Sequence, residues 1–204
     1  MPSSYASFDF LFIAQELSSK LGSATLGEIH LFAYLGCLLS LFKGQPVAEW
    51  GYGFAGLESG APFGPELQEA YSDLERAGLV SIVTNGVVVS EVGIQRLEIF
   101  NTLNTFTVRK PFLAAACDSL LSFPVGLVRS AMSMEPGLRP VISIGGLRPL
   151  LAMRSLEQLH EHFDALTTVV GVTSDLLVPS TVWLTYLLDL ARKHDREVIS
   201  RATA

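Results

Sequence analysis

The pattern that most restricts the fold of this chain is a pair of short β-rich runs, residues 79–83 and 87–89, joined at Thr84-Asn85-Gly86. Asn-Gly is the dipeptide that type I′ hairpin turns prefer, because both central residues of such a turn need a positive φ. We therefore predict an antiparallel β-hairpin closed by an Asn-Gly turn.

Three helices are predicted ahead of the hairpin. Residues 8–21 repeat apolar side chains at helical spacing. Residues 25–42 begin with Thr25, and Glu28 follows three residues later, which is the spacing of a capping box. Residues 65–77 form a shorter amphipathic helix that begins with a proline, a residue well suited to the first helical turn.

The order of helix, helix, short helix and hairpin is that of a winged helix, in which the short helix is the recognition helix and the hairpin is the wing. A further helix at residues 91–101 follows, with Ile94, Leu97 and Phe100 predicted to face inward. We predict a mainly α chain, in which residues 1–101 form a winged-helix region and residues 102–204 form a helical region packed on it.

The second region is punctuated by prolines, and its pattern is less regular. An apolar run at residues 140–144 suggests a short strand. Helices are predicted near residues 109–121, 124–134, 146–164 and 180–193.

The composition points to a partner. The 204 residues are 49% hydrophobic and 17% charged, where an average soluble domain carries roughly 25% charged residues. Stretches without a charged residue stay short of the ~18 apolar residues that a membrane span needs. The N-terminus does not resemble a secretory signal, so we predict a cytoplasmic chain without a membrane partner. Its excess apolar surface is expected to be covered by another protein, as in obligate subunits.

Charge argues against DNA binding by the predicted winged helix. Residues 66–76 carry four acidic side chains and one basic one, and residues 80–90 carry no Lys or Arg. Because neutralised phosphates supply most non-specific affinity for DNA, this face is a poor DNA reader. We predict instead that a basic protein surface docks on the recognition helix through Glu66, Glu69 and Asp73.

The middle of the chain has the opposite charge. Residues 101–156 hold six basic and two acidic side chains. Scattered arginines are usually solvated, but they also suit phosphates and the carboxylates of an acidic partner. Contact with DNA and contact with an acidic partner both stay open for four of them: Arg129, Arg139, Arg148 and Arg154.

No motif predicts an active site, a metal or a cofactor. His160 and His162 stand two apart and would point to different sides of a helix. Ser143-Ile144-Gly145-Gly146 lacks the lysine and spacing of a phosphate-binding loop. Cys37 and Cys117 stand in apolar surroundings and are expected to be buried. The aromatic loop Trp50-Gly51-Tyr52-Gly53-Phe54 either anchors a partner or, as we favour, packs the first helices.

Four segments carry a resemblance to a known family: Glu28-Ile29-His30-Leu31-Phe32-Ala33-Tyr34-Leu35, Trp50-Gly51-Tyr52-Gly53-Phe54, Pro62-Phe63-Gly64-Pro65-Glu66-Leu67 and Leu74-Glu75-Arg76-Ala77-Gly78-Leu79-Val80. Over about residues 8–100 the chain resembles the middle components of bacterial three-component ABC-type systems, of which the Lamassu anti-phage systems with their SMC-like ATPase are the best-known relatives. The same segment is similar to the Panacea antitoxin domain, although Leu31 stands where that pattern has a basic residue.

The first resemblance implies a non-catalytic adaptor subunit that binds an SMC-like ATPase and holds an effector subunit, expected to be a nuclease. DNA would then be met only indirectly or through the basic middle of the chain. The alternative is an antitoxin or a winged-helix regulator of the transcription type, which neutralises a partner or binds DNA. An enzyme whose site the sequence does not reveal is a third possibility.

Overall fold

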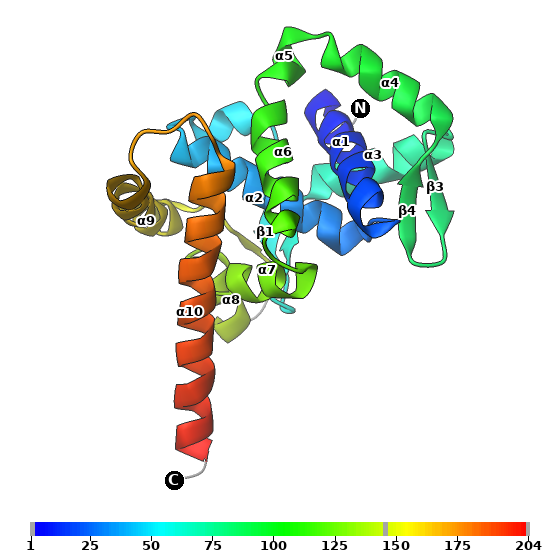
Figure 1. Cartoon of the computed structure of the whole chain (residues 1–204). Helices are drawn as coiled ribbons and strands as arrows, with labels where there is room; N and C mark the ends of the chain where they lie inside the picture. Colours follow the sequence, from blue (N-terminus) through cyan, green and yellow to red (C-terminus); the bar gives the residue numbers. More distant parts are fainter. Residues whose placement is uncertain (1–2, 145–146, 203–204) are drawn as a thin grey trace. The chain divides into compact units, whose positions relative to one another are not determined.

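The computed structural model describes residues 3–144 and 147–202 (Figure 1). The chain is mainly helical, with 68% helix and 8% strand, as the sequence predicts. It divides into two compact units. The first comprises the described residues up to Ala55 together with Pro62–Cys117, and the second comprises Gly56–Ala61 and the described residues from Asp118 onward.

The first unit contains the predicted helices and hairpin in the expected order. The first unit also contains a 3₁₀ turn at Val47–Trp50, the two-residue strand β2 (Pro62–Phe63) and the short helix α5 (Asn104–Thr107), and the boundary between the units falls within the two-residue strand β1 (Ala55–Gly56). The main elements are α1 (Ser4–Leu21), α2 (Leu26–Phe42), α3 (Pro65–Arg76), β3 (Val80–Val83), β4 (Gly86–Val89), α4 (Glu91–Asn101) and α6 (Lys110–Asp118).

Helix α2 is the centre of the first unit. Its predicted capping box is confirmed, since the Glu28 amide donates to Thr25 Oγ1 at 3.2 Å and the Thr25 amide donates to the Glu28 carboxylate at 2.8 Å. Every residue from Ile29 to Leu41 is buried. The longest charge-free helical run of the sequence is therefore core.

The hairpin forms, but its predicted Asn-Gly turn is wrong. Val83 pairs with Gly86, so the loop is Thr84-Asn85, and within the described residues only glycines have a positive φ. Gly86, at φ 147°, instead allows a close approach: Ala24 pairs with Val87, and a Cβ on Gly86 would collide with the Ala24 carbonyl oxygen. Because Gly86 has no Cβ, β4 can pack closely against the connection between α1 and α2.

Helix α4 faces inward through Leu97 and Phe100, as predicted, but not through Ile94. Gly93 and Leu97 are its buried residues, Phe100 is half-buried, and Ile94 is 37% exposed. Gly93 packs directly against the Leu79 carbonyl, so closely that a Cβ there would collide with it. That contact fixes the rotation of the helix, and the prediction for Ile94 was wrong because sequence spacing does not show it.

A buried ion pair joins the two ends of the first unit. Asp9 of α1 accepts hydrogen bonds from Arg109 Nε at 2.9 Å, from Arg109 Nη2, and from the Tyr52 hydroxyl at 2.6 Å. The guanidinium also lies 3.9 Å from the Trp50 ring and donates to the Trp50 carbonyl at 2.8 Å. Burial raises the pKa of the Asp9 carboxyl, and the Arg109 charge opposes that shift.

This network settles two sequence interpretations. Trp50, Tyr52 and Phe54 are all buried, so the aromatic loop packs the core and the reading as a partner anchor was wrong. Arg109 belongs to the core and not to the surface of the basic middle. The first unit continues to Cys117, beyond the boundary predicted after residue 101.

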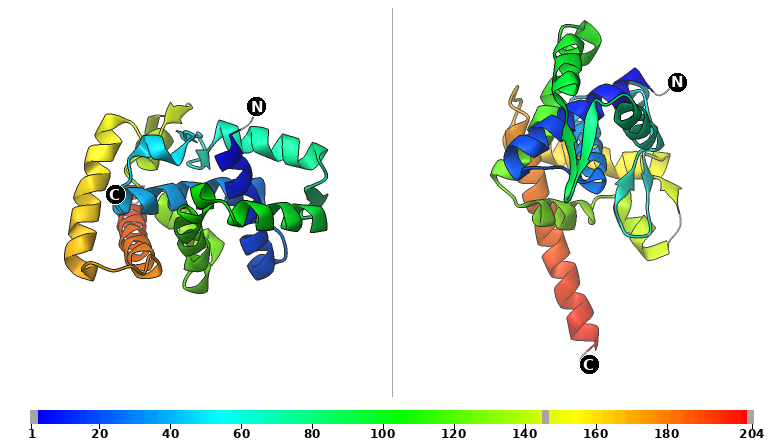
Figure 2. Two further views of the ribbon diagram at one scale, coloured as in Figure 1. Left: turned by 90° about the horizontal axis from the view of Figure 1, so that it is seen from above. Right: turned by 90° about the vertical axis from the view of Figure 1, so that its right-hand side faces the viewer.

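The second unit is built around a long helix. Helix α10 (Leu177–Ala202) packs against α7 (Val125–Met132) and α9 (Met153–Val170), as the views in Figure 2 also show. Residues 192–197 of α10 are all exposed. The remaining elements are the 3₁₀ turn Ser119–Leu121, α8 (Leu138–Ile144) and the two-residue strand β5 (Arg148–Pro149).

Two predictions for the second unit were wrong. Residues 140–144 belong to helix α8 and not to a strand, because Glu135 starts a helical turn: its carboxylate accepts from the Leu138 amide at 2.8 Å and its carbonyl from the Arg139 amide at 2.9 Å. The helix expected at 146–164 begins at Met153 and ends at Val170. Gly145 and Gly146 lie outside the described residues.

Candidate docking surfaces

Helix α3 presents the three acidic residues that the sequence singled out. Leu67, Ala70 and Leu74 form its buried side, which packs on α1. Glu66, Glu69 and Asp73 follow one another at spacings of three and four residues, so they form a single stripe along the helix. Glu69 is exposed, and Glu66 and Asp73 are half-buried. The three residues thus lie on one side of α3, and Oε2 of Glu66 is buried there.

The local charge around this stripe is negative. Arg76 donates to Asp73 at 2.8 Å; the Arg76 side chain is exposed and the Asp73 side chain is 42% accessible, so the pair contributes little stability. The adjoining hairpin has no basic residue and instead exposes Ile82, which is 65% accessible. An acidic stripe beside an apolar hairpin suits a basic protein surface better than a phosphate backbone.

The four arginines of the basic middle do not form one cluster. All four are exposed on the second unit. Arg148 and Arg154 line one cavity, and Arg139 lines a second cavity that shares Pro136, Pro140 and Gln158 with the first. Arg129 lies on α7 and lines neither of them. Three arginines are therefore neighbours, which the sequence could not show.

The cavity of Arg148 and Arg154 has features that favour an anion. Ser155 and Ala152 line it as well, at the start of α9, where no side chain caps the first turn. Uncapped amides at a helix N-terminus carry a partial positive charge that adds to that of the arginines. A phosphate of DNA and a carboxylate of a protein partner both match this chemistry, so the structure leaves both alternatives in place.

The histidines have separate surroundings. His30 of α2 is buried and accepts a hydrogen bond from the Gly64 amide at 3.1 Å, and burial lowers its pKa to about 4. His160 is exposed, whereas His162 is half-buried against Tyr186, and burial lowers the pKa of His162 too. The described residues contain no group of three or more His, Cys, Asp or Glu side chains that could hold a metal ion.

Both cysteines are buried, as predicted. Burial raises the pKa of the Cys37 thiol, so this side chain stays protonated at neutral pH.

Sequence reasoning missed an apolar groove between α9 and α10. The sequence feature that could have indicated this groove is the wide apolar face of α9. Leu159, Phe163 and Leu166 of that face are buried, and Ala165 and Val169 extend it onto the exposed side of the helix. A helix that covers one core needs a narrower stripe.

Comparisons with models of protein families, with curated proteins and with solved structures find no match to this chain. Within residues 3–144 and 147–202, no single helix is long and apolar enough to cross a membrane. One bent pair of helical stretches, Asn104–Leu121 and Val125–Met132, passes that test by length and composition alone.

Proposed function

We propose that this chain is a non-catalytic adaptor subunit of a bacterial anti-phage defence complex, in which it bridges an SMC-like ATPase and an effector subunit. The proposal rests on the resemblance of about residues 8–100 to the middle components of three-component systems. The observation that carries it is the acidic stripe of Glu66, Glu69 and Asp73 on α3, beside a hairpin without basic residues.

We further propose that α1 to β4 form a winged helix, with α3 as the recognition helix. The pairing of Ala24 with Val87 supports this assignment. It adds a third extended segment, from the connection between α1 and α2, to the two strands of the hairpin. Other winged-helix domains place the recognition helix on DNA. Here we propose that this helix, α3, faces a protein instead.

Electrostatics favours this use of α3. Carboxylates repel phosphates, whereas a patch of Lys and Arg on a partner is attracted, which speeds encounter and fixes the docking orientation. The stripe is partly exposed, so its contribution falls as salt rises. A DNA-binding winged helix has the opposite charge on this face.

An antitoxin or DNA-binding regulator is the second candidate function. The observation that favours it is the group of Arg139, Arg148 and Arg154 around two adjoining cavities of the second unit. Contact with DNA would then fall on these arginines and not on α3. Contact between the same arginines and an acidic surface of the effector is consistent with the adaptor.

The adaptor is tested by co-purification of the chain with the SMC-like ATPase of a three-component locus. Reversal of two charges on the stripe, Glu69→Lys with Asp73→Lys, is expected to weaken association about tenfold at about 50 mM salt and much less at about 500 mM. The matched control, Glu91→Lys with Glu98→Lys, changes two exposed acidic residues on α4 and should leave association intact.

If the stripe variant binds the ATPase as tightly as the natural chain does at low salt, α3 is not part of the interface. If the chain never joins the ATPase but binds duplex DNA alone, and loses that binding when Arg139, Arg148 and Arg154 become Ala, the regulator replaces the adaptor.

A further inference from the structure

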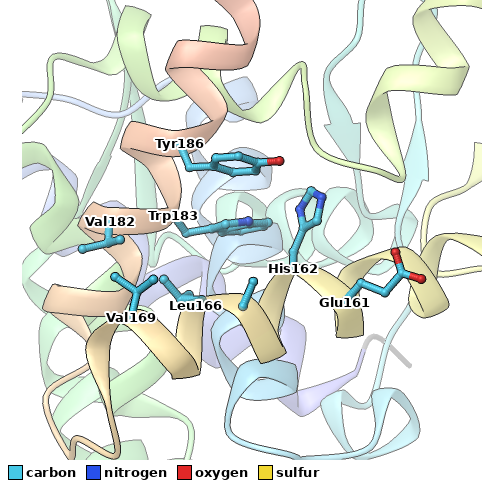
Figure 3. A pocket seen from close by; sticks show the side chains of 8 residues that line it. Glu161, His162, Leu166, Val169, Val182, Trp183 and Tyr186 are labelled. Atoms are coloured by element: carbon cyan, nitrogen blue, oxygen red, sulfur yellow. The ribbon is translucent and has the colours of Figure 1, made fainter.

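The groove between α9 and α10 is an open hollow of about 250 Å³ in the second unit (Figure 3). Trp183 and Tyr186 extend from α10, and His162 points from α9 toward the Tyr186 ring, with the ring centroids 5.4 Å apart. Ala165 and Val169 complete the wall formed by α9. The lining is almost entirely apolar.

This apolar lining is exposed to solvent. Val169 is 74% exposed and Tyr186 is 47% exposed. Val172, in the connection between α9 and α10, is fully exposed as well, and Val178 on α10 is 46% exposed. Single exposed apolar residues are ordinary, but a contiguous set beside a hollow marks an interaction site.

Two polar atoms in the lining lack partners. Nε1 of Trp183 and Nδ1 of His162 are buried, and neither forms a hydrogen bond within the part of the chain that the structure describes. The Trp183 side chain is only 2% exposed. A buried polar atom without a partner costs free energy and calls for an explanation, such as a group that is absent when the chain is alone.

The size of the hollow favours a protein side chain over a small molecule. Sites for small molecules are typically ~300–1,000 Å³ and enclose most of the ligand, whereas this hollow is smaller and open on one side. A hollow of this size accepts one or two apolar side chains, in the way that a pocket accepts the anchor residues of an interface. The two helical walls suit an anchor presented by a third helix.

One edge of the groove is acidic. Glu157, Glu161 and Asp164 are exposed on α9 at spacings of four and three residues, so they form a row beside Ala165 and Val169. Among the described residues none of the three forms an ion pair. On α10, Asp189 lies 3.5 Å from Arg192. A row of unpaired carboxylates next to an apolar groove selects an occupant with positive charge along one side.

We propose that this groove binds an amphipathic helix of a partner protein, which inserts apolar anchors between α9 and α10 and places Lys or Arg against Glu157, Glu161 and Asp164. A second copy of the chain fits less well, because its net charge is −6. This proposal does not depend on the adaptor function, since the α3 stripe that carries that function lies on the first unit and the groove lies on the second.

The probe for the test is a fluorescein-labelled model peptide of about 18 residues, with leucines on one helical face and lysines on the other. Fluorescence anisotropy with the full chain should give saturable binding. Val169→Asp should weaken it at least about tenfold, because it places a charge in the apolar wall. The matched control is Ile82→Asp, which changes a similarly exposed apolar residue of the first unit and should alter affinity less than about twofold.

The acidic row is tested by a triple variant, Glu157→Gln, Glu161→Gln and Asp164→Asn. It should weaken peptide binding about fivefold at about 50 mM salt and less than twofold at about 500 mM. The control neutralises the stripe of α3 in the same way, with Glu66→Gln, Glu69→Gln and Asp73→Asn, and should leave the affinity nearly unchanged. Circular dichroism verifies that each variant is folded.

Three results overturn the proposal. The first is a peptide affinity that Val169→Asp leaves unchanged. The second is an equal loss for the α9 and α3 triple variants, which would mean that overall charge and not the groove attracts the peptide. The third is a self-association of the chain, seen by sedimentation, that Val169→Asp abolishes, because the occupant is then a second copy.

Discussion

Both compact units bury an apolar core and expose some apolar side chains, but they differ in where their most apolar helical segments lie. In the first unit the longest charge-free helical run, within α2, is buried from Ile29 to Leu41. In the second unit Val169 and Val172 of the α9–α10 segment remain largely exposed. A high mean hydropathy, +0.40 for the chain, therefore does not locate an interface. Much of the excess is the core of the first unit, and the apolar groove for which we propose a partner helix lies on the second.

The two units also differ in where the charged residues discussed above lie. The first unit buries one cation and one anion as a pair, Asp9 with Arg109, and encloses them in aromatic rings. The second unit keeps its arginines and the carboxylates of α9 exposed. A buried pair rarely adds stability relative to apolar residues, but removal of one partner is costly. A single substitution in this buried pair should thus be costly, whereas single substitutions of the exposed charges on α9 should cost little.

The largest effect is expected from Arg109→Met. This change leaves the Asp9 carboxylate buried with only the Tyr52 hydroxyl as a hydrogen-bond donor. Breaking a buried pair from one side costs about 3–5 kcal/mol, and urea unfolding followed by circular dichroism measures the loss. The double variant Asp9→Leu with Arg109→Met removes both charges and should recover much of it. If the single variant costs less than the double, the pair does not organise this core.

A smaller effect is expected from His30 as the pH falls. Its pKa is lowered to about 4 in the folded chain, from 6.5 for an unperturbed histidine, because the ring is buried. Below pH 6.5 the unfolded chain takes up a proton that the folded chain does not. The stability that His30 contributes is complete above pH 6.5 and is lost between pH 6.5 and about 4, by about 3 kcal/mol in total.

His30→Asn provides the control for this pH dependence. Its side-chain oxygen can accept the Gly64 amide, as His30 Nδ1 does, but it does not titrate. Urea unfolding at several pH values between 7 and about 4.5 should show a flatter profile for the variant than for the natural chain. If the variant and the natural chain lose stability identically as the pH falls, titratable groups other than His30 cause the loss.

The parts of the fold that could be predicted are those with local signals. The capping box at Thr25 and the hairpin at β3 and β4 follow from short-range spacing, and both are present. The turn was misassigned because the use of Gly86 depends on Ala24, which is distant in sequence. The orientation of α4 depends on the contact of Gly93 with Leu79 in the same way.

The candidate surfaces show the same limit. The stripe of Glu66, Glu69 and Asp73 could be predicted because one helix carries all three residues at helical spacing. The proximity of Arg139, Arg148 and Arg154 could not, because they lie on α8, β5 and α9. The role of Arg109 was also hidden, since its partner Asp9 is a hundred residues away in the sequence.

The smallest change in the free energy of unfolding is expected for an exposed apolar residue of the second unit, compared with a buried one of the first. Val169→Ser on α9 should change the free energy of unfolding by less than about 0.5 kcal/mol, because the residue is exposed in the chain alone. Val87→Ser makes the same chemical change at a buried position of β4 and should cost about 1–3 kcal/mol. Urea midpoints of both variants measure this difference. A large cost for Val169→Ser would place it in a core, whereas a small cost together with lost peptide binding means that Val169 serves an interface and not the stability of its own unit.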